Sequence, residues 1–131
     1  MGFFNNPDFG KLILRVGVGF LMLFHGFAKI VGGIGFIKGM VVKNGFPEFL
    51  AYGVYVGEVI APIMLLIGLQ TRVAATIIAV TMLMAIYLVH PNEVFVLGNH
   101  GAWAIELPAF YIFASLAILF LGAGKYSVDK S

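Results

Sequence analysis

Four long stretches of apolar residues, separated by shorter and more polar segments, dominate the pattern of this chain. They cover residues 11–31, 48–69, 73–90 and 103–121. A helix of about 20 apolar residues crosses the hydrocarbon core of a bilayer, so each stretch predicts a transmembrane helix. The pattern therefore predicts an all-α four-helix transmembrane bundle that forms a single membrane domain over residues 1–131.

The connections between these segments differ in length. Residues 68–72 form a tight turn, so the second and third helices should be antiparallel neighbours. Residues 32–47 are rich in glycine and include an amphipathic stretch at 36–43, which predicts a short interfacial helix between helices one and two. Residues 91–102 form the other long connection, on the same side of the membrane.

The composition agrees with a membrane location. The chain is 61% hydrophobic and 11% charged, whereas soluble domains carry about 25% charged residues. We therefore expect the lipid bilayer to be its main partner. The scattered Lys and Arg residues form no basic patch for nucleic acid. The absence of cysteine excludes disulfides, thiolate catalysis and Cys-ligated clusters.

The distribution of Lys and Arg predicts the orientation. The side that holds both termini and the tight turn carries Lys11, Arg15, Arg72, Lys125 and Lys130. The opposite side carries Lys29, Lys38 and Lys43. Cytoplasmic loops carry the excess of Lys and Arg, so we expect a multi-pass protein of the cell's inner membrane with both termini in the cytoplasm.

Five ionisable side chains lie inside the apolar segments. They are Arg15, His25, Lys29, Glu58 and Glu106. A charged side chain at mid-bilayer costs roughly 2.5–3.5 kcal/mol, so these groups should face one another inside the bundle. On helix one, the helical period places the charged positions on or beside one stripe with Gly19 and Gly26. Small residues on this stripe would allow a neighbouring helix to approach closely.

Helix two carries a carboxylate beside a predicted break. Tyr55, Glu58 and Pro62 share one face. Proline has no N–H, so the carbonyl of Glu58 loses its helical partner. Glu58 is therefore the first candidate for a functional residue.

Depth along each helix, at about 1.5 Å per residue, predicts which charges meet. Lys29 should lie level with Glu106, and His25 with Glu58, while Arg15 approaches from the opposite end. The predicted ligand-binding pocket consists of Arg15, His25, Lys29, Tyr55, Glu58 and Glu106. An alternative is that these charges only lock the helices together.

We expect no metal or haem in this pocket. The Glu-x-x-His spacing of di-iron bundles is absent. His90 and His100 fall at a helix end and in a loop, so they cannot supply facing haem ligands. Trp103, Tyr126 and Tyr52 lie near predicted interfaces and are interpreted as belt residues.

Several motifs resemble the DoxX family of small four-helix membrane proteins. They are Leu14-Arg15 and Phe24-His25-Gly26-Phe27-Ala28-Lys29, then Gly57-Glu58 and Leu66-Ile67-Gly68-Leu69-Gln70-Thr71-Arg72, and finally Gly122-Ala123-Gly124-Lys125-Tyr126-Ser127-Val128-Asp129. Members are often labelled oxidoreductases, and the family is similar to the membrane subunits of a thiosulfate:quinone oxidoreductase. The resemblance implies a redox role that involves quinone or thiol stress. The chain lacks cysteine and a Gly-x-Gly-x-x-Gly motif, so we expect no cofactor held by this chain alone, and redox chemistry would need a quinone or a partner redox protein.

Three functions remain open at this stage. The first is a redox-associated membrane subunit whose pocket takes a quinone or a similar small ligand. In it, His25 would hydrogen-bond the ligand, Glu58 would handle a proton and Arg15 would balance charge. The second is a scaffold or assembly subunit without enzymatic activity. The third is a small-solute or proton transporter, which would need to form a homo-oligomer.

Overall fold

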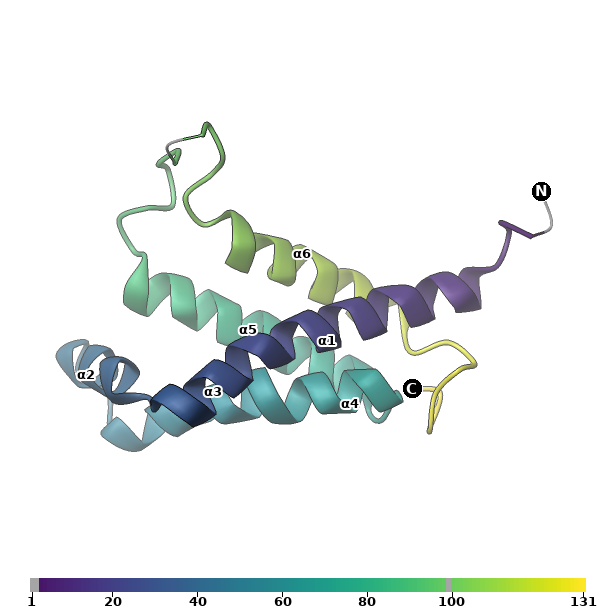
Figure 1. The fold of residues 1–131 in the computed structure, drawn as a ribbon, viewed down its shortest axis with the longest axis horizontal. Coiled ribbons are helices and arrows are strands. Elements are labelled where there is room, and N and C mark those ends of the chain that lie inside the picture. Colours follow the sequence, from purple (N-terminus) through teal and green to yellow (C-terminus); the bar gives the residue numbers. More distant parts are fainter. Residues whose placement is uncertain (1–2, 99) are drawn as a thin grey trace.

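A computed structural model describes residues 3–98 and 100–131, and these residues form helices and loops but no strand. The long helices are α1 (Pro7–Gly32), α5 (Thr71–Val89) and α6 (Glu106–Leu121) (Figure 1). Between α1 and α5 lie α2 (Gly35–Lys43), η1 (Glu48–Tyr52), α3 (Gly53–Tyr55), η2 (Val56–Ile60) and α4 (Ala61–Ile67). The predicted all-α class is confirmed, but the chain is divided into more helices than the four expected.

Helix α1 has a well-defined start and end. The Asn6 side chain accepts a hydrogen bond from the backbone N–H of Phe9 at 3.1 Å, which satisfies one of the free donors of the first turn. Pro7 occupies the first helical position, where a missing N–H costs nothing. The helix ends at Gly32, and the next residue, Gly33, has a φ of 81° that favours glycine.

The second predicted helix is not uniform. The chain enters it through the 3-10 turn η1 and changes to the wider π-helix η2 before α4. In η2, the N–H of Ala61 bonds to the carbonyl of Val56, five residues earlier. Pro62 follows directly and offers no N–H to the carbonyl of Glu58. The predicted break at Glu58 is therefore present as a local change of helix type.

Among the residues that the structure describes, three segments are long and apolar enough to cross a membrane: Pro7–Gly32, Glu48–Ile67 and Thr71–Val89. Helix α6 is apolar but has only 16 residues. The prediction that it begins at residue 103 was wrong. Trp103 forms an antiparallel bridge with Leu97, and the N–H of Ala104 donates to the carbonyl of Val96 at 2.8 Å. These bonds hold the residues before Glu106 outside the helix.

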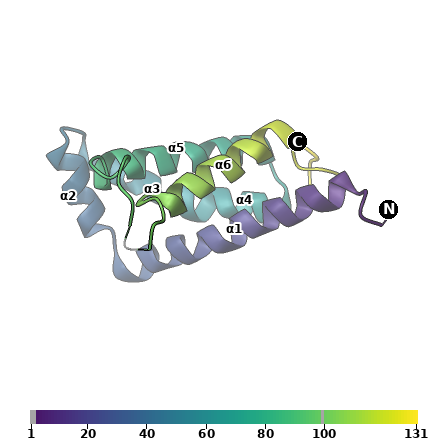
Figure 2. The same cartoon turned by 90° about the horizontal axis from the view of Figure 1, so that it is seen from above.

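The long helices run side by side along the length of the molecule (Figures 1 and 2). Helix α1 packs against η2 and α4, and α5 packs against α4 and α6. Helices α4 and α5 are joined by a tight turn at Gly68, with φ of 76°, as predicted for antiparallel neighbours. Helix α2 lies at one end of the molecule, and both termini lie at the other (Figures 1 and 2).

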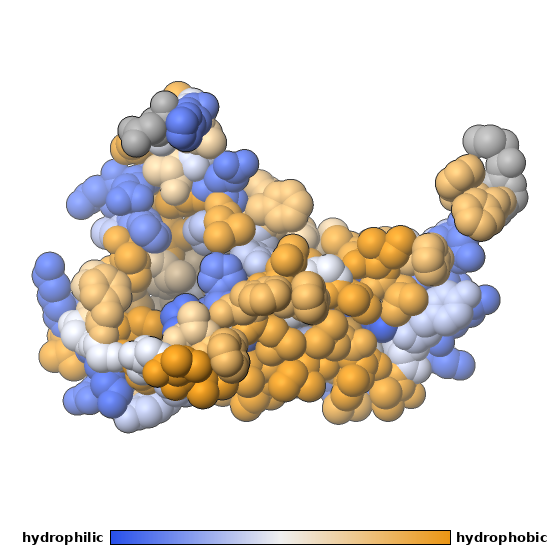
Figure 3. Space-filling model, viewed as in Figure 1, coloured by the Kyte–Doolittle hydropathy of each residue, from blue (hydrophilic) through white to orange (hydrophobic). Residues whose placement is uncertain are grey.

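Apolar side chains fill the space between the helices and also cover much of the outside. The central cluster includes Met22, Leu65, Ile78 and Ile118. Figure 3 shows a broad apolar surface along the molecule. Large apolar side chains that are exposed include Phe20 and Phe24 of α1 and Phe110 and Phe113 of α6. A hydrophobic exterior over helices whose backbones are internally bonded is what a bilayer requires.

Candidate functional site

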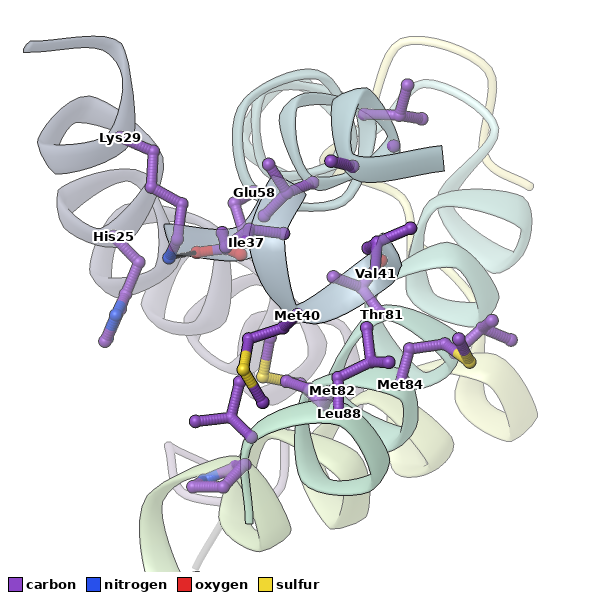
Figure 4. Close-up of a pocket in the computed structure, with 18 of the residues that line it drawn as sticks. His25, Lys29, Ile37, Met40, Val41, Glu58, Thr81, Met82, Met84 and Leu88 are labelled. Atoms are coloured by element: carbon purple, nitrogen blue, oxygen red, sulfur yellow. Dashed lines mark hydrogen bonds and ion pairs between the residues drawn. The ribbon is translucent and has the colours of Figure 1, made fainter. Parts of the chain in front are cut away.

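A cavity of about 830 Å³ opens between α1, α2, η2, α5 and α6. Most of its lining is apolar, with Ile37 and Met40 from α2 and Met82 and Leu88 from α5 (Figure 4). His25 and Lys29 enter it from α1, and Glu58 enters it from η2. The cavity therefore combines a large apolar wall with a small polar region.

An ion pair forms the polar region. The Lys29 ammonium lies 2.7 Å from the Glu58 Oε1 (Figure 4). The Glu58 side chain is 5% exposed and that of Lys29 is 27% exposed. A buried carboxylate needs such a partner, because an unpaired charge in an apolar site is costly. Both residues line the cavity, so the pair is available to a bound molecule.

Two glycines allow three helices to meet at Glu58. A methyl group on Gly26 of α1 would overlap the backbone carbonyl oxygen of Glu58. A methyl group on Gly57 would overlap the Thr81 side chain of α5. Glycine therefore lets α1 and α5 approach η2 from both sides, which fixes the position of Glu58 between them.

His25 and Tyr55 support this region in different ways. His25 lies one helical turn before Lys29, lines the cavity and meets the Tyr111 ring edge-on, with centroids 5.8 Å apart. The Tyr55 hydroxyl donates to the backbone carbonyl of Lys29 at 3.2 Å and does not line the cavity. Tyr55 thus ties the end of α3, directly before η2, to the end of α1.

The predicted pairing of charges was wrong in two respects. Lys29 pairs with Glu58, where we expected His25, and Glu106 does not reach Lys29. Glu106 is exposed at the start of α6, and within the part of the chain that the structure describes it forms no ion pair. Its carboxylate lies in the first turn of α6, where the helix dipole favours negative charge.

Arg15 lies outside the cavity, at the end that holds the termini. It is 1% exposed, and its guanidinium donates to the backbone carbonyls of Ala123 at 3.4 Å and Tyr126 at 2.8 Å. The Asp129 side chain accepts from the Gln70 N–H at 2.8 Å, and the Val128 N–H donates to the carbonyl of Ile67 at 3.1 Å. We call residues 122–129 with Arg15 the C-terminal clasp, because they fasten the chain end to α1 and the α4–α5 turn.

Hydrogen bonds shift one pKa in this clasp. The pKa of Asp129 is held below its ordinary value by the Ser131 hydroxyl and by the backbone N–H groups of Gln70 and Ser131. The closed clasp therefore favours the ionised carboxylate form of Asp129.

Sequence reasoning missed four polar residues that line the cavity: Thr76, Thr81, His90 and Tyr111. Thr81 and Tyr111 are polar residues within predicted transmembrane segments, so the sequence pattern could have indicated them as candidates for the pocket. The Thr81 hydroxyl donates to the carbonyl of Ile77 in its own helix at 2.8 Å. His90 lies 3.0 Å from the Glu93 carboxylate. Within residues 3–98 and 100–131, no three His, Asp or Glu residues are grouped as metal ligands would be.

Comparison with known proteins identifies the family. The DoxX family model matches residues 10–91. The chain belongs to the DoxX family. A relative from Haemophilus influenzae, named only as an uncharacterized protein, is 34% identical over 124 residues, which cover 89% of this chain and 86% of the relative. A Bacillus subtilis protein named "Putative oxidoreductase CatD" is 34% identical over 92 residues, 70% of this chain and 67% of that protein. No solved structure matches the chain.

Proposed function

We propose that this DoxX protein is a redox-associated membrane subunit whose cavity binds a quinone or a similar small ligand with a polar head. The observation that carries the proposal is the Lys29–Glu58 ion pair at the wall of a large apolar cavity. A volume of 830 Å³ falls in the range of about 300–1,000 Å³ that small-molecule sites occupy. An ion pair that only locked helices together would not need such a space beside it.

The side chains at the cavity suit the chemistry of a quinone head. Reduction of a quinone adds electrons and protons to its carbonyl oxygens, so the site needs hydrogen-bond donors and a group that exchanges protons. We assign donation to Lys29 and His25 and proton exchange to Glu58. Met40 and Met82 supply flexible apolar contacts for a ring.

The electrons would come from a partner redox protein. The chain has no cysteine, and it carries no Gly-x-Gly-x-x-Gly motif for a dinucleotide. The oxidoreductase name of the Bacillus subtilis relative supports a redox role. We place the protein in the cell's inner membrane, where membrane quinones and such a partner would both be accessible.

A scaffold role is the second candidate, and the C-terminal clasp favours it. Arg15 is buried, and within the described part of the chain its guanidinium bonds to the backbone carbonyls of residues 123 and 126, so one intramembrane charge serves structure. In this alternative the Lys29–Glu58 pair would serve structure as well.

Quinone binding by wild type and two variants separates these functions. The purified protein in detergent is heated with and without a short-chain quinone. Ligand at about 100 times its Kd should stabilise wild type by roughly 2.7 kcal/mol. Glu58→Gln should lose most of this shift, because Gln cannot titrate or hold Lys29 as an ion pair. Glu106→Gln is the matched control, since Glu106 lies outside the cavity lining, and it should keep the shift. Absence of a shift in wild type would reject the proposal.

We propose a cytoplasmic location for both termini, supported by the excess of Lys and Arg on their side. A fluorescent protein fused after Ser131 should fold and emit light in the cytoplasm. Alkaline phosphatase at the same site should be inactive. The opposite pattern would reverse the orientation.

A further inference from the structure

The connection between α5 and α6 has a definite shape. The Trp103 indole N–H donates to the backbone carbonyl of Val94. The N–H of Ala104 donates to the carbonyl of Val96 at 2.8 Å, and Leu97 and Trp103 form an antiparallel bridge. We call residues 94–97 with Trp103 and Ala104 the interhelical hairpin. Its backbone is held by its own hydrogen bonds, although it belongs to no helix.

The interhelical hairpin exposes apolar side chains. Phe95 is 98% exposed, and Leu97 is 68% exposed. Val96 and Trp103 are also exposed. Phe95 and Leu97 in particular are largely uncovered by the described part of the chain, and such exposed apolar side chains mark an interaction surface.

The direction of the hairpin indicates what this environment is. In Figure 1 the hairpin projects sideways, across the long axis of the helices, whereas α2 extends along that axis to the end of the molecule. Figure 2 shows the same connection within the length of the bundle rather than beyond its end. If the long helices cross the bilayer, the hairpin extends parallel to the membrane plane, toward the lipid beside the bundle.

Apolar side chains are also exposed at the start of α6. Leu107 and Phe110 follow the hairpin in sequence, and both are exposed. Polar groups lie close by in sequence, with Glu93 before the hairpin and His100 within the connection. Apolar and aromatic side chains next to polar ones suit the boundary between lipid headgroups and acyl chains.

We propose that the interhelical hairpin is a membrane-interface anchor, with Phe95, Leu97 and Trp103 inserted at the headgroup–acyl boundary of the leaflet on the α2 side. His90, at the start of the connection, and Leu107, in the first turn of α6, both line the cavity. The anchor would therefore hold this side of the cavity at the membrane surface. This inference does not depend on which ligand the cavity binds.

The fluorescence of Trp103 tests the anchor directly, because the chain has a single tryptophan. The full chain is reconstituted in phosphatidylcholine–phosphatidylglycerol vesicles. Some vesicles carry lipids brominated near the headgroup end of the acyl chain, and others carry lipids brominated near its middle. Bromine quenches tryptophan only at short range. We expect a larger loss of Trp103 fluorescence with the shallow label and little quenching by acrylamide in the water phase.

Two further variants measure the depth of other positions in the bilayer. Trp103→Phe with Phe95→Trp moves the only tryptophan to the most exposed position of the hairpin, and the shallow label should again quench it more strongly. Trp103→Phe with Phe113→Trp is the control, because Phe113 is exposed well inside α6, and the deeper label should quench it more. Strong acrylamide quenching of position 95 without bromolipid quenching would place the hairpin in water. Protection from both quenchers would indicate a protein partner. Either result would overturn the proposal.

Discussion

Gly26 of α1 lies against the backbone carbonyl of Glu58, so closely that a methyl group on Gly26 would overlap the carbonyl oxygen. This carbonyl is the one that Pro62 deprives of an N–H donor. The broken helix and the small residue thus meet at one point. The contact brings Lys29, one turn further along α1, within 2.7 Å of the Glu58 carboxylate.

Gly26→Ala should push α1 away from η2. Forcing an extra methyl group into a closely packed contact costs typically about 1–3 kcal/mol, so we expect the free energy of unfolding in detergent to fall by this amount. Gly17→Ala is the control, because Gly17 lies in the same helix with open space around it. Alanine favours a helix over glycine by about 1 kcal/mol, so this variant should be as stable as wild type or slightly more stable. Equal effects at both positions would contradict the close contact.

Lys29→Met and Glu58→Gln should lower the free energy of unfolding by different amounts. Lys29→Met leaves the Glu58 carboxylate, 5% exposed, without its cation, and loss of one partner of a buried pair costs up to about 3–5 kcal/mol. Glu58→Gln leaves Lys29, which is 27% exposed and can turn toward water or headgroups. Urea unfolding in mixed micelles should therefore rank Lys29→Met as less stable than Glu58→Gln, with the double variant between Lys29→Met and wild type. The reverse order would show that Lys29 is the more deeply confined charge.

Arg15→Lys should open the C-terminal clasp. The arginine guanidinium bonds two carbonyls at once, and a lysine ammonium lacks the planar fork that does this. Trypsin should therefore cut after Lys125 faster than in wild type, while the helices stay intact by circular dichroism. Lys43→Gln, which removes an exposed cation at the other end of the molecule, should leave the rate of this cut unchanged. An unchanged rate in Arg15→Lys would mean that the other bonds of the clasp, from Val128 to Ile67 and from Gln70 to Asp129, hold it without Arg15.

The clasp should also loosen in acid. The folded-state pKa of Asp129 lies below its ordinary value of 3.8, so its contribution to stability is complete above pH 3.8 and is lost as the pH falls through the lowered folded pKa. The melting temperature of wild type should exceed that of Asp129→Asn at neutral pH, and the difference should shrink only below pH 3.8. A difference that disappears well above that pH would contradict the hydrogen bonds to Gln70 and Ser131.

The sequence by itself determined the class of the protein and the place of its main irregularity. Runs of apolar residues near the length of a membrane span predicted helices, because in lipid a backbone must bond to itself. Pro62 predicted the break at Glu58, since the missing N–H is a covalent property of the residue. The stripe with Gly19 and Gly26 predicted close packing of α1, and both glycines do lie against η2 or α4. These are local or periodic properties, which a sequence carries directly.

Only the tertiary structure decided which charges meet. The depth estimate assumed straight, complete helices, but the second segment begins with a 3-10 turn and contains a π-helix, and α6 begins at Glu106. These irregularities shift the level of each side chain, so Lys29 reaches Glu58 and Glu106 stays outside. Arg15 finds its partner 108 residues away, at Ala123. From the sequence one can predict that each buried charge has a partner, because an unpaired charge is too costly in an apolar core. Which partner it finds depends on how the whole chain is folded.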